Sequence, residues 1–279
     1  MTALTVGFIG AGRIGEPMVE RLLAAGHRVR LYARRPEVRN RLAALGAEPV
    51  ALVRDIAAAD IVVSCLFGDD QISAVLPEVV AAMPEGAILL SHTTGTPDAL
   101  DGLDRFAPNG RGATIVEASF SGTPEAVRAG ELVVFLGGAP GDIATARRVV
   151  GCYAGTVIAT GGRGSALRVK LLNNLLFAAV SQLTLQSLAA GRGLGIEEGV
   201  LLEVLSISSG GSTAGRYIAA RGGSESFTAA VAPFLRKDVA ACRDALGATD
   251  ADIGTLLAAA CTGPIDLGAV PTLEKGVVP

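Results

Sequence analysis

The chain has 279 residues, of which 50% are hydrophobic and 18% are charged, with a formal net charge of -3 at pH 7. This length predicts one large or two ordinary domains with a sizeable core, and the charge gives no electrostatic reason to expect a nucleic-acid or anionic-membrane partner. Four scattered cysteines without a Cys-x-x-Cys pair indicate reduced thiols and a cytoplasmic protein, and two histidines without a carboxylate cluster predict no metal site.

The first apolar run, 4–9, lacks a preceding basic region and is interpreted as a core strand rather than a signal peptide. It leads into the pattern Gly-x-Gly-x-x-Gly, and a helix-period segment follows at 14–25. Such glycines permit a tight turn, a close approach of backbone amides to a pyrophosphate, and close helix–strand packing. A glycine-rich turn without a ligand is the alternative, but the strand and helix around it favour a dinucleotide site. The residues assigned to this site are Gly10, Ala11, Gly12, Arg13, Ile14 and Gly15.

The second expected strand, 28–33, ends in Arg34 and Arg35. NAD-selective sites place a carboxylate about 20 positions after the glycines, and none stands here. Two guanidinium groups instead offer charge-assisted hydrogen bonds that suit a 2′-phosphate. The sequence therefore favours NADP(H) over NAD(H), with a solvated basic turn as the alternative.

Strand and helix patterns alternate as far as about residue 160 and predict an α/β fold, a Rossmann-type doubly wound sheet over residues 1–162. The strand pattern then disappears, and residues 163–279 are expected to form an all-helical domain. Its most apolar segment, 171–190, carries four amide side chains and is interpreted as a buried helix rather than a membrane span. The further strands are expected at 60–66, 86–91, 113–118, 131–137 and 155–160, and helices at 37–45, 71–82, 140–150, 165–192, 196–207, 229–246 and 250–261.

Two further segments indicate chemistry. After a strand end near Ala118, the residues Ser121, Gly122 and Thr123 precede a helix that opens at Pro124, an arrangement that suits a small carboxylate. An ordinary helix cap is the alternative interpretation.

The second segment is the start of the expected helix 165–192, where Lys170 stands in an apolar stretch. Helical spacing places Asn173 and Asn174 on the same side as Lys170. A snorkelling surface charge is the alternative, but burial would allow a lysine to exchange a proton near neutral pH.

Together these motifs resemble the β-hydroxyacid dehydrogenase family, which includes 3-hydroxyisobutyrate dehydrogenase, tartronate semialdehyde reductase and related semialdehyde reductases. The opening stands as G-F-I-G-A-G-R-I-G-E-P-M, the substrate motif as E-A-S-F-S-G-T, and the catalytic motif as Lys170 to Asn174 in K-L-L-N-N. A late Lys-Asp pair matches Lys237–Asp238. The chain departs from the family pattern at Glu117, Ser119, Phe120, Thr123 and Ala166, which leaves the substrate open.

The resemblance implies a hydride transfer between nicotinamide and a small oxo acid held between the domains. Lys170 would be the acid/base, Asn174 would orient it or bind the reacting oxygen, and residues 121–123 would hold the carboxylate. Further cofactor contacts implied by the family are Leu66, Phe67, Thr94 and Lys237.

Two rival functions are an imine reductase, whose members generally replace the catalytic lysine, and a non-catalytic dinucleotide-binding redox sensor. Lys170 weighs against the imine reductase, and the intact pair of Lys170 and Asn174 weighs against the sensor. The apolar helical part also predicts a homodimer or tetramer, with C-terminal helices packed on a neighbouring subunit.

Overall fold

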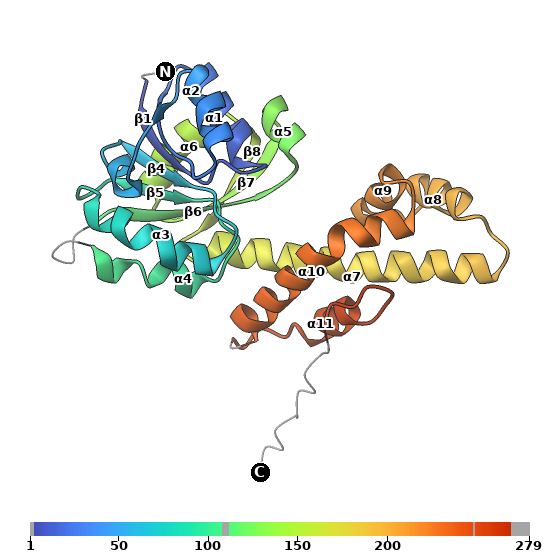
Figure 1. Ribbon diagram of the computed structural model, residues 1–279. Coiled ribbons are helices and arrows are strands. Elements are labelled where there is room, and N and C mark those ends of the chain that lie inside the picture. The colour runs from blue at the N-terminus through green and yellow to red at the C-terminus, as the bar shows by residue number, and fades with distance from the viewer. Residues whose placement is uncertain (1–2, 108–111, 248, 269–279) are drawn as a thin grey trace, which may run out of the picture. The chain divides into compact units, whose positions relative to one another are not determined.

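The computed structural model describes residues 3–107, 112–247 and 249–268. The chain divides into two compact units, Met1–Lys170 and Leu171–Pro279. The long helix α7 (Ser165–Gly193) begins in the first unit and continues in the second (Figure 1). The domain limits expected from the sequence, 1–162 and 163–279, stay a prediction.

The first unit is built on one eight-stranded sheet with the strand order β3-β2-β1-β4-β5-β6-β7-β8. All neighbouring strands are parallel except β6 and β7, which run antiparallel. The strands are β1 (Thr5–Ile9), β2 (Arg28–Tyr32), β3 (Glu48–Pro49), β4 (Ile61–Ser64), β5 (Ile88–Ser91), β6 (Thr114–Ser121), β7 (Leu132–Gly137) and β8 (Ala154–Gly161). The helices of this unit are α1 (Gly15–Ala24), α2 (Pro36–Ala44), η1 (Val53–Ala57), α3 (Asp69–Ala82), α4 (Pro97–Asp101), η2 (Asp104–Phe106), α5 (Pro124–Ala129) and α6 (Pro140–Val150).

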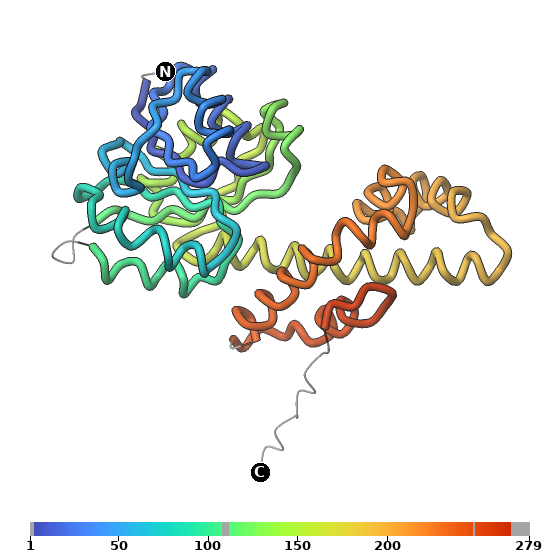
Figure 2. Tube along the Cα trace, viewed as in Figure 1, coloured from blue at the N-terminus to red at the C-terminus, as the bar shows by residue number. Residues whose placement is uncertain are grey.

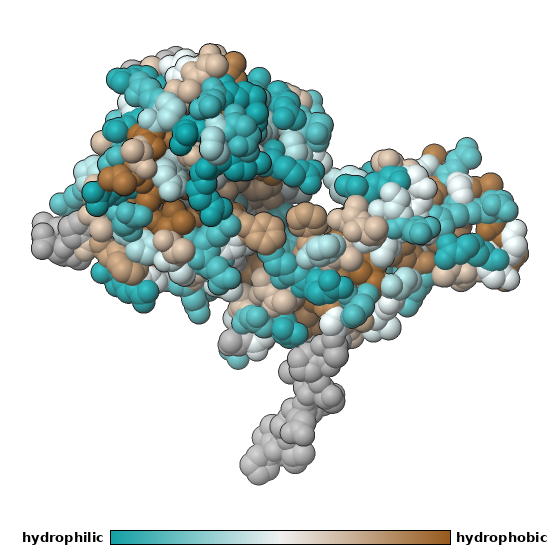
Figure 3. Space-filling model, viewed as in Figure 1, coloured by the Kyte–Doolittle hydropathy of each residue, from teal (hydrophilic) through white to brown (hydrophobic). Residues whose placement is uncertain are grey.

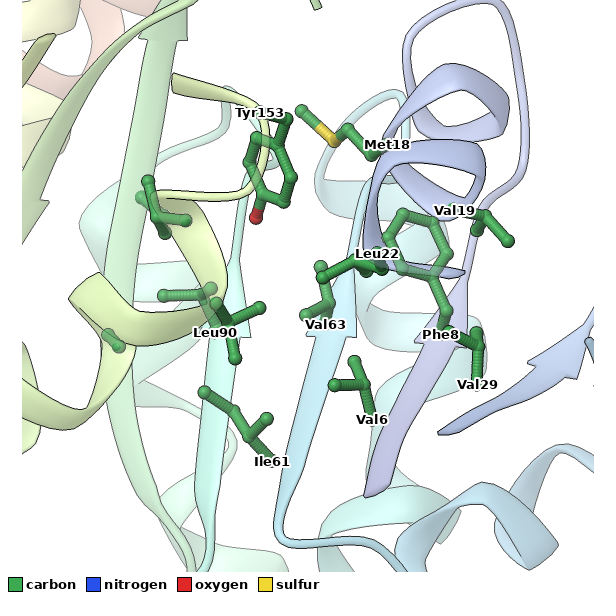
Figure 4. Close-up of a cluster of buried hydrophobic side chains, with 14 of the residues drawn as sticks. Val6, Phe8, Met18, Val19, Leu22, Val29, Ile61, Val63, Leu90 and Tyr153 are labelled. Carbon is green, nitrogen blue, oxygen red and sulfur yellow. The ribbon is translucent and has the colours of Figure 1, made fainter. Parts of the chain in front are cut away.

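Helices cover both faces of this sheet, and each face has its own apolar core (Figures 1 and 2). On one face, side chains of α1, α2, α5 and α6 pack on the sheet, and Figure 4 shows Leu22 of α1 beside Phe8 and Val63, with Met18 directed toward Tyr153. On the other face, η1, α3, α4 and the first turn of α7 pack on the sheet. The strands β4 and β5 are buried along their whole length, as parallel strands covered on both sides must be.

The predicted fold class is confirmed, since a doubly wound sheet is followed by helices alone in the described part of the second unit. These helices are the remainder of α7, then α8 (Glu198–Ile207), α9 (Thr213–Ala220), α10 (Ser224–Leu246) and α11 (Gly254–Cys261). One apolar core joins them. Inside it, the buried Gln182 side chain donates to the carbonyls of Ala260 and Ile265 at 3.0 and 2.6 Å and accepts from the Ile265 N–H at 3.0 Å, which fixes the end of α11 to α7.

Some elements differ from the sequence expectation. The short strand β3 and the helices α4 and α9 were not predicted, and α10 begins at Ser224 rather than at residue 229. The early start has a tertiary cause, because Glu198 accepts the Ser224 N–H at 2.6 Å and its hydroxyl at 2.8 Å. Within the described ranges, none of the helices combines the length and the apolar character that a membrane crossing needs.

Candidate functional site

The glycine turn after β1 has the geometry that a dinucleotide site needs. Gly10 has φ +92°, and a Cβ there would collide with the Cys65 carbonyl, while a Cβ at Gly15 would collide with the Gly10 carbonyl. A Cβ at Gly12 would meet nothing within 4 Å. Two glycines are therefore required by packing, and the third lies beside open space at the N-terminus of α1, where phosphates bind in this kind of turn.

Arg35 lies next to this turn, because its guanidinium donates to the Ala11 carbonyl at 3.1 Å. Arg34 is exposed beside it, and the side chain of Arg35 is 57% exposed. Oε1 of Glu37 lies 4.0 Å from Nε of Arg35, and both side chains are exposed. This carboxylate is therefore only a weak, solvent-screened ion-pair partner for Arg35. Both guanidinium groups therefore stand at the end of β2, where the ribose of a dinucleotide lies in such folds.

The loops that follow β4 and β5 are tied to each other. Leu66 donates its N–H to the Thr93 hydroxyl at 3.1 Å, and Asp69 accepts the N–H of Thr96 at 3.1 Å and its hydroxyl at 2.9 Å. Phe67 is 61% exposed, and Thr94 is half-buried. Because β1, β4 and β5 are parallel neighbours, their carboxyl ends place the glycine turn and these two loops at one edge of the sheet, at the point where the strand order reverses.

The expected carboxylate cradle follows β6 at the same edge, since β6 is parallel to β5. Gly122 has φ +142°, and a Cβ there would meet the Leu132 side chain at 2.8 Å. Thr123 caps the short helix α5, its hydroxyl oxygen accepting the Ala126 N–H at 3.4 Å. The helix-cap interpretation of this hydroxyl is thus present in the structure, and a hydrogen bond from the Thr123 side chain lowers the pKa of the neighbouring Glu125 carboxyl.

Glu117 is a buried carboxylate that the sequence analysis noted only as a departure from the family motif. It is 1% exposed and accepts the backbone N–H groups of Gly164 (2.5 Å), Ala166 (3.0 Å) and Leu167 (3.2 Å), at the start of α7. Burial raises the pKa of Glu117, while these hydrogen bonds and the charge of Arg163 act in the opposite direction. No local pattern predicts this contact, which joins residues 47 to 50 positions apart.

Lys170 lies two residues into the second turn of α7 and is half-buried. In the second unit, Asn174 is 8% exposed and donates to Asp238 at 2.9 Å, and Asn173 donates to the Asn174 oxygen at 3.2 Å. Lys237 lies 3.8 Å from Asp238. The structure therefore gathers Asn174 and Lys237, predicted from separate motifs, around a carboxylate whose role the sequence analysis did not identify.

His92 directly precedes Thr93, and its buried ring holds the loop after β5 in place through two hydrogen bonds. Its Nδ1 donates to the Ala118 carbonyl at 2.6 Å, so its Nε2 accepts from the Tyr153 hydroxyl at 2.8 Å. Burial lowers the pKa of His92 to about 4, and burial raises the pKa of Tyr153. The imidazole is therefore neutral and structural at physiological pH.

Within the described residues, no group of three or more His, Cys, Asp or Glu side chains is placed to hold a metal ion. Apart from Lys170 in α7, the sequence-predicted residues of the first unit thus share one sheet edge, and Asn174 and Lys237 of the second unit lie around Asp238. The roles assigned to the individual residues stay predictions.

Comparison with known proteins assigns both parts of the chain. Residues 5–162, more than half of the chain, match the NAD-binding domain of 6-phosphogluconate dehydrogenase, and residues 164–266 match the NAD-binding domain of NADP-dependent 3-hydroxyisobutyrate dehydrogenase. Among relatives, 3-hydroxyisobutyrate dehydrogenase of Pseudomonas aeruginosa is 30% identical over 224 residues, which cover 75% of this chain and 71% of that enzyme. The mitochondrial rat enzyme is 28% identical, and the matched region covers 74% of this chain but only 62% of the rat enzyme.

Solved structures share the fold. A Mycobacterium tuberculosis 3-hydroxyisobutyrate dehydrogenase with L-serine superposes with a TM-score of 0.81 and 24% identity, covering 93% of this chain and 92% of its own. Psf3 in complex with NADP+ and 2-OPP gives a TM-score of 0.76 and 25% identity, covering 94% and 97%. Together with the family matches over residues 5–162 and 164–266, these likenesses lead to one conclusion: the chain belongs to the β-hydroxyacid dehydrogenase family.

Proposed function

We propose that the protein is an NADP(H)-dependent oxidoreductase that interconverts a small β-hydroxy acid and its aldehyde or oxo acid. The observation that carries the proposal is that Asn174, four residues after Lys170 on α7, is buried and held by Asp238. A merely solvated lysine would need no such fixed amide one turn away. Relatives named 3-hydroxyisobutyrate, L-serine and L-threonate dehydrogenase agree with this reaction class.

The glycine turn fits a dinucleotide cofactor. Side chains at Gly10 and Gly15 are excluded by backbone carbonyls, whereas the space beside Gly12 is open. Arg34 and Arg35 stand where the adenosine ribose lies in this fold and offer forked donors to a 2′-phosphate. The same position would hold an acidic residue in an NAD-selective site, which is the reason for preferring NADP(H).

The remaining cofactor contacts are assigned by position and by family resemblance. Leu66 and Phe67 follow β4 and would line the nicotinamide side, and Thr94 lies in the loop that Thr93 and Asp69 hold in place. Lys237, beside Asp238, is assigned as a cofactor contact by the family resemblance alone.

A bound nicotinamide would supply the hydride for reduction of a carbonyl carbon, or accept it in oxidation. Lys170 as an ammonium group would protonate the developing alkoxide, and as a free amine it would accept the hydroxyl proton in the reverse direction. Asn174 has one amide hydrogen engaged by Asp238, and its second one can orient Lys170 or bind the reacting oxygen. Backbone and hydroxyl donors of Ser121, Gly122 and Thr123 would hold the substrate carboxylate.

We also propose a homodimer or tetramer. The exposed side of α8 carries Val200, Val204 and Ile207, which are 54%, 48% and 85% exposed. Three large apolar side chains at helical spacing on one surface helix are typical of a contact surface. A second copy of this chain would cover them, as the family resemblance implies.

A cytoplasmic location remains part of the proposal.

The test is a linked-activity screen with NADPH and NADH. The reduction panel is glyoxylate, succinic semialdehyde, tartronate semialdehyde, methylmalonate semialdehyde and cyclic imines, and the oxidation panel is 3-hydroxyisobutyrate, L-serine and L-threonate. We expect turnover of at least one carboxylate-bearing substrate, with NADPH or NADP+ preferred. Turnover of the imines alone would replace the proposal by an imine reductase, and cofactor binding without any turnover would favour a sensor.

A further inference from the structure

The start of α7 is held by one buried carboxylate. The first N–H groups of a helix have no partner within the helix and need an outside acceptor when they are buried. Glu117 supplies it, accepting from Gly164, Ala166 and Leu167 at 2.5, 3.0 and 3.2 Å with only 1% of the residue exposed. The positive end of the helix macrodipole favours a carboxylate at this point.

The neighbouring strand leaves room for this carboxylate. Glu117 of β6 lies opposite Gly137 of β7 in the antiparallel pair. A Cβ at position 137 would meet Oε2 of Glu117 at 2.8 Å, the Ser165 Oγ at 2.9 Å and the Ala166 nitrogen at 3.0 Å. Glycine at 137 is therefore required by the approach of α7 to the sheet, and a hydrogen bond of 2.8 Å between Ser165 and Thr160 of β8 fixes the same turn from the other side.

The charge of Arg163 acts on Glu117, but the direct contacts of this guanidinium group are with other residues. Arg163 precedes the helix, but its ion pairs go to Asp101 at 2.7 Å and Asp104 at 2.9 Å, and it also donates to the Leu100 carbonyl at 2.7 Å. The hydrogen bonds that the Glu117 carboxylate accepts in the described part of the chain come from backbone N–H groups at the start of α7. This carboxylate therefore acts on the position of a helix rather than on a side chain.

Glu117 connects two parts of the proposed site through short stretches of chain. Ser121 lies four residues further along β6, and Lys170 lies three residues after Leu167, about one turn of α7. All of these residues belong to the first compact unit. The carboxylate consequently joins the strand that leads to the substrate cradle to the helical turn that leads to the lysine.

We propose that Glu117 is a positioning residue, which sets the height and rotation of the first turn of α7 and thereby the place of the Lys170 ammonium group relative to the carboxyl end of β6. This inference rests on the acid/base role proposed for Lys170. A simple helix cap would affect stability alone, whereas a positioning residue affects turnover at a given stability.

Glu117→Gln keeps the size of the side chain but replaces one acceptor oxygen by an NH2 group, which cannot accept from an N–H. We expect kcat to fall roughly 10- to 100-fold, the range for a displacement of a reacting group by about 1 Å. KM and the Kd for NADPH should change less than threefold. Independently of activity, hydrogen exchange at the amides of Gly164, Ala166 and Leu167 should become faster.

Two further variants separate position from charge. Glu117→Asp restores both acceptor oxygens on a shorter side chain and should recover part of the lost kcat. Gly137→Ala leaves the carboxylate intact but displaces it and the Ala166 nitrogen, so it should lower kcat as Glu117→Gln does. If Glu117→Gln does not fold, the same measurements on Gly137→Ala test the positioning role of Glu117.

The matched control is Ser212→Ala, which removes the cap of α9, where the Ser212 Oγ accepts the Gly215 N–H at 3.0 Å. It should lower the Tm and leave kcat at the wild-type value. Lys170→Met is measured in parallel. If Lys170→Met loses turnover and folded Glu117→Gln does not, the positioning role is overturned while the proposed function stands. The same conclusion follows if Glu117→Asp has no higher kcat than Glu117→Gln. Normal turnover in Lys170→Met overturns both.

Discussion

The two compact units bury their apolar side chains to different extents. The first unit has a separate apolar core on each face of its sheet, and the second has one core. Among the described residues, ten large apolar side chains of the shorter second unit are exposed, against five in the first. Apolar residues are accordingly seen on the surface of the helical unit in Figure 3. The first unit can satisfy its own packing, whereas the second has apolar surface left to cover.

The units also differ in the chemistry assigned to them. The first carries the glycine turn and both arginines of the cofactor site, and Lys170 is its last residue. The second contributes Asn174, Asp238 and Lys237, which lie in one polar cluster. The difference predicts that cofactor affinity, turnover and assembly can be changed separately.

The largest effect is expected at Lys170. Lys170→Met should lower kcat by about 10² to 10⁴, the usual contribution of a positioned acid–base group, without changing the Kd for NADPH. Asn174→Ala should cost less, because the amide orients the lysine and does not transfer the proton. Steady-state kinetics and fluorescence titration with NADPH provide the two values.

Arg168→Met is the matched control, since it removes an exposed cation from the same helix two residues earlier. It should retain wild-type kcat. Near-normal turnover in a folded Lys170→Met variant would contradict the assignment of the chemistry to this end of α7.

The next effect concerns the stability of the first unit in acid. Burial lowers the pKa of His92 from 6.5, its ordinary value and that expected in the unfolded chain, to about 4 in the folded protein. The folded state therefore binds the proton less readily than the unfolded state. Its contribution to the free energy of unfolding is complete above pH 6.5 and is lost as the pH falls to 4, by about 3 kcal/mol. Urea unfolding of the wild type and of His92→Asn between pH 7 and pH 4 isolates this term by difference. An NMR titration of His92 near pH 6.5 would show that the imidazole is not buried as described.

Cofactor selectivity should respond to the arginines of the first unit. Replacing Arg34 and Arg35 by serine removes charge-assisted hydrogen bonds of roughly 1.5–3 kcal/mol each. The ratio of kcat/KM for NADPH to that for NADH should therefore fall at least tenfold. Arg216→Ser with Arg221→Ser, two exposed arginines of the second unit, should leave the ratio unchanged. An equal loss with both cofactors, or a wild type that prefers NADH, would refute the preference.

The smallest effect on the folding of one chain is expected on the apolar side of α8. Val204→Asp with Ile207→Asp changes exposed positions, so the free energy of unfolding of a single chain should change by about 0.5 kcal/mol or less per site. Light scattering should nevertheless show a smaller assembly than for the wild type, while Glu203→Gln on the same helix should not alter the mass. A wild type that is monomeric at micromolar concentration would contradict the proposed assembly through α8.

Patterns that depend on neighbouring residues were readable from the sequence. The turn from β1 to α1 is specified by Gly10 and Gly15, because packing excludes a side chain at both positions. The alternation of buried strands with helices predicted the doubly wound sheet, and the expected limits of α7, 165–192, differ from the observed ones by one residue. In each case the hydrophobic period or a glycine within a few positions contains the information.

Tertiary structure alone decided the contacts between distant segments. The antiparallel direction of β7, the early start of α10 at Ser224, and the hydrogen bonds from the start of α7 to Glu117 all depend on groups that are far apart in the chain. A buried N–H or carboxylate must find a partner, but the sequence does not state which one, because many acceptors are available until the chain is folded. Local periodicity therefore determined most of the elements, though not β3, α4 and α9, and the pairing of buried polar groups determined where some of them begin and how they are held.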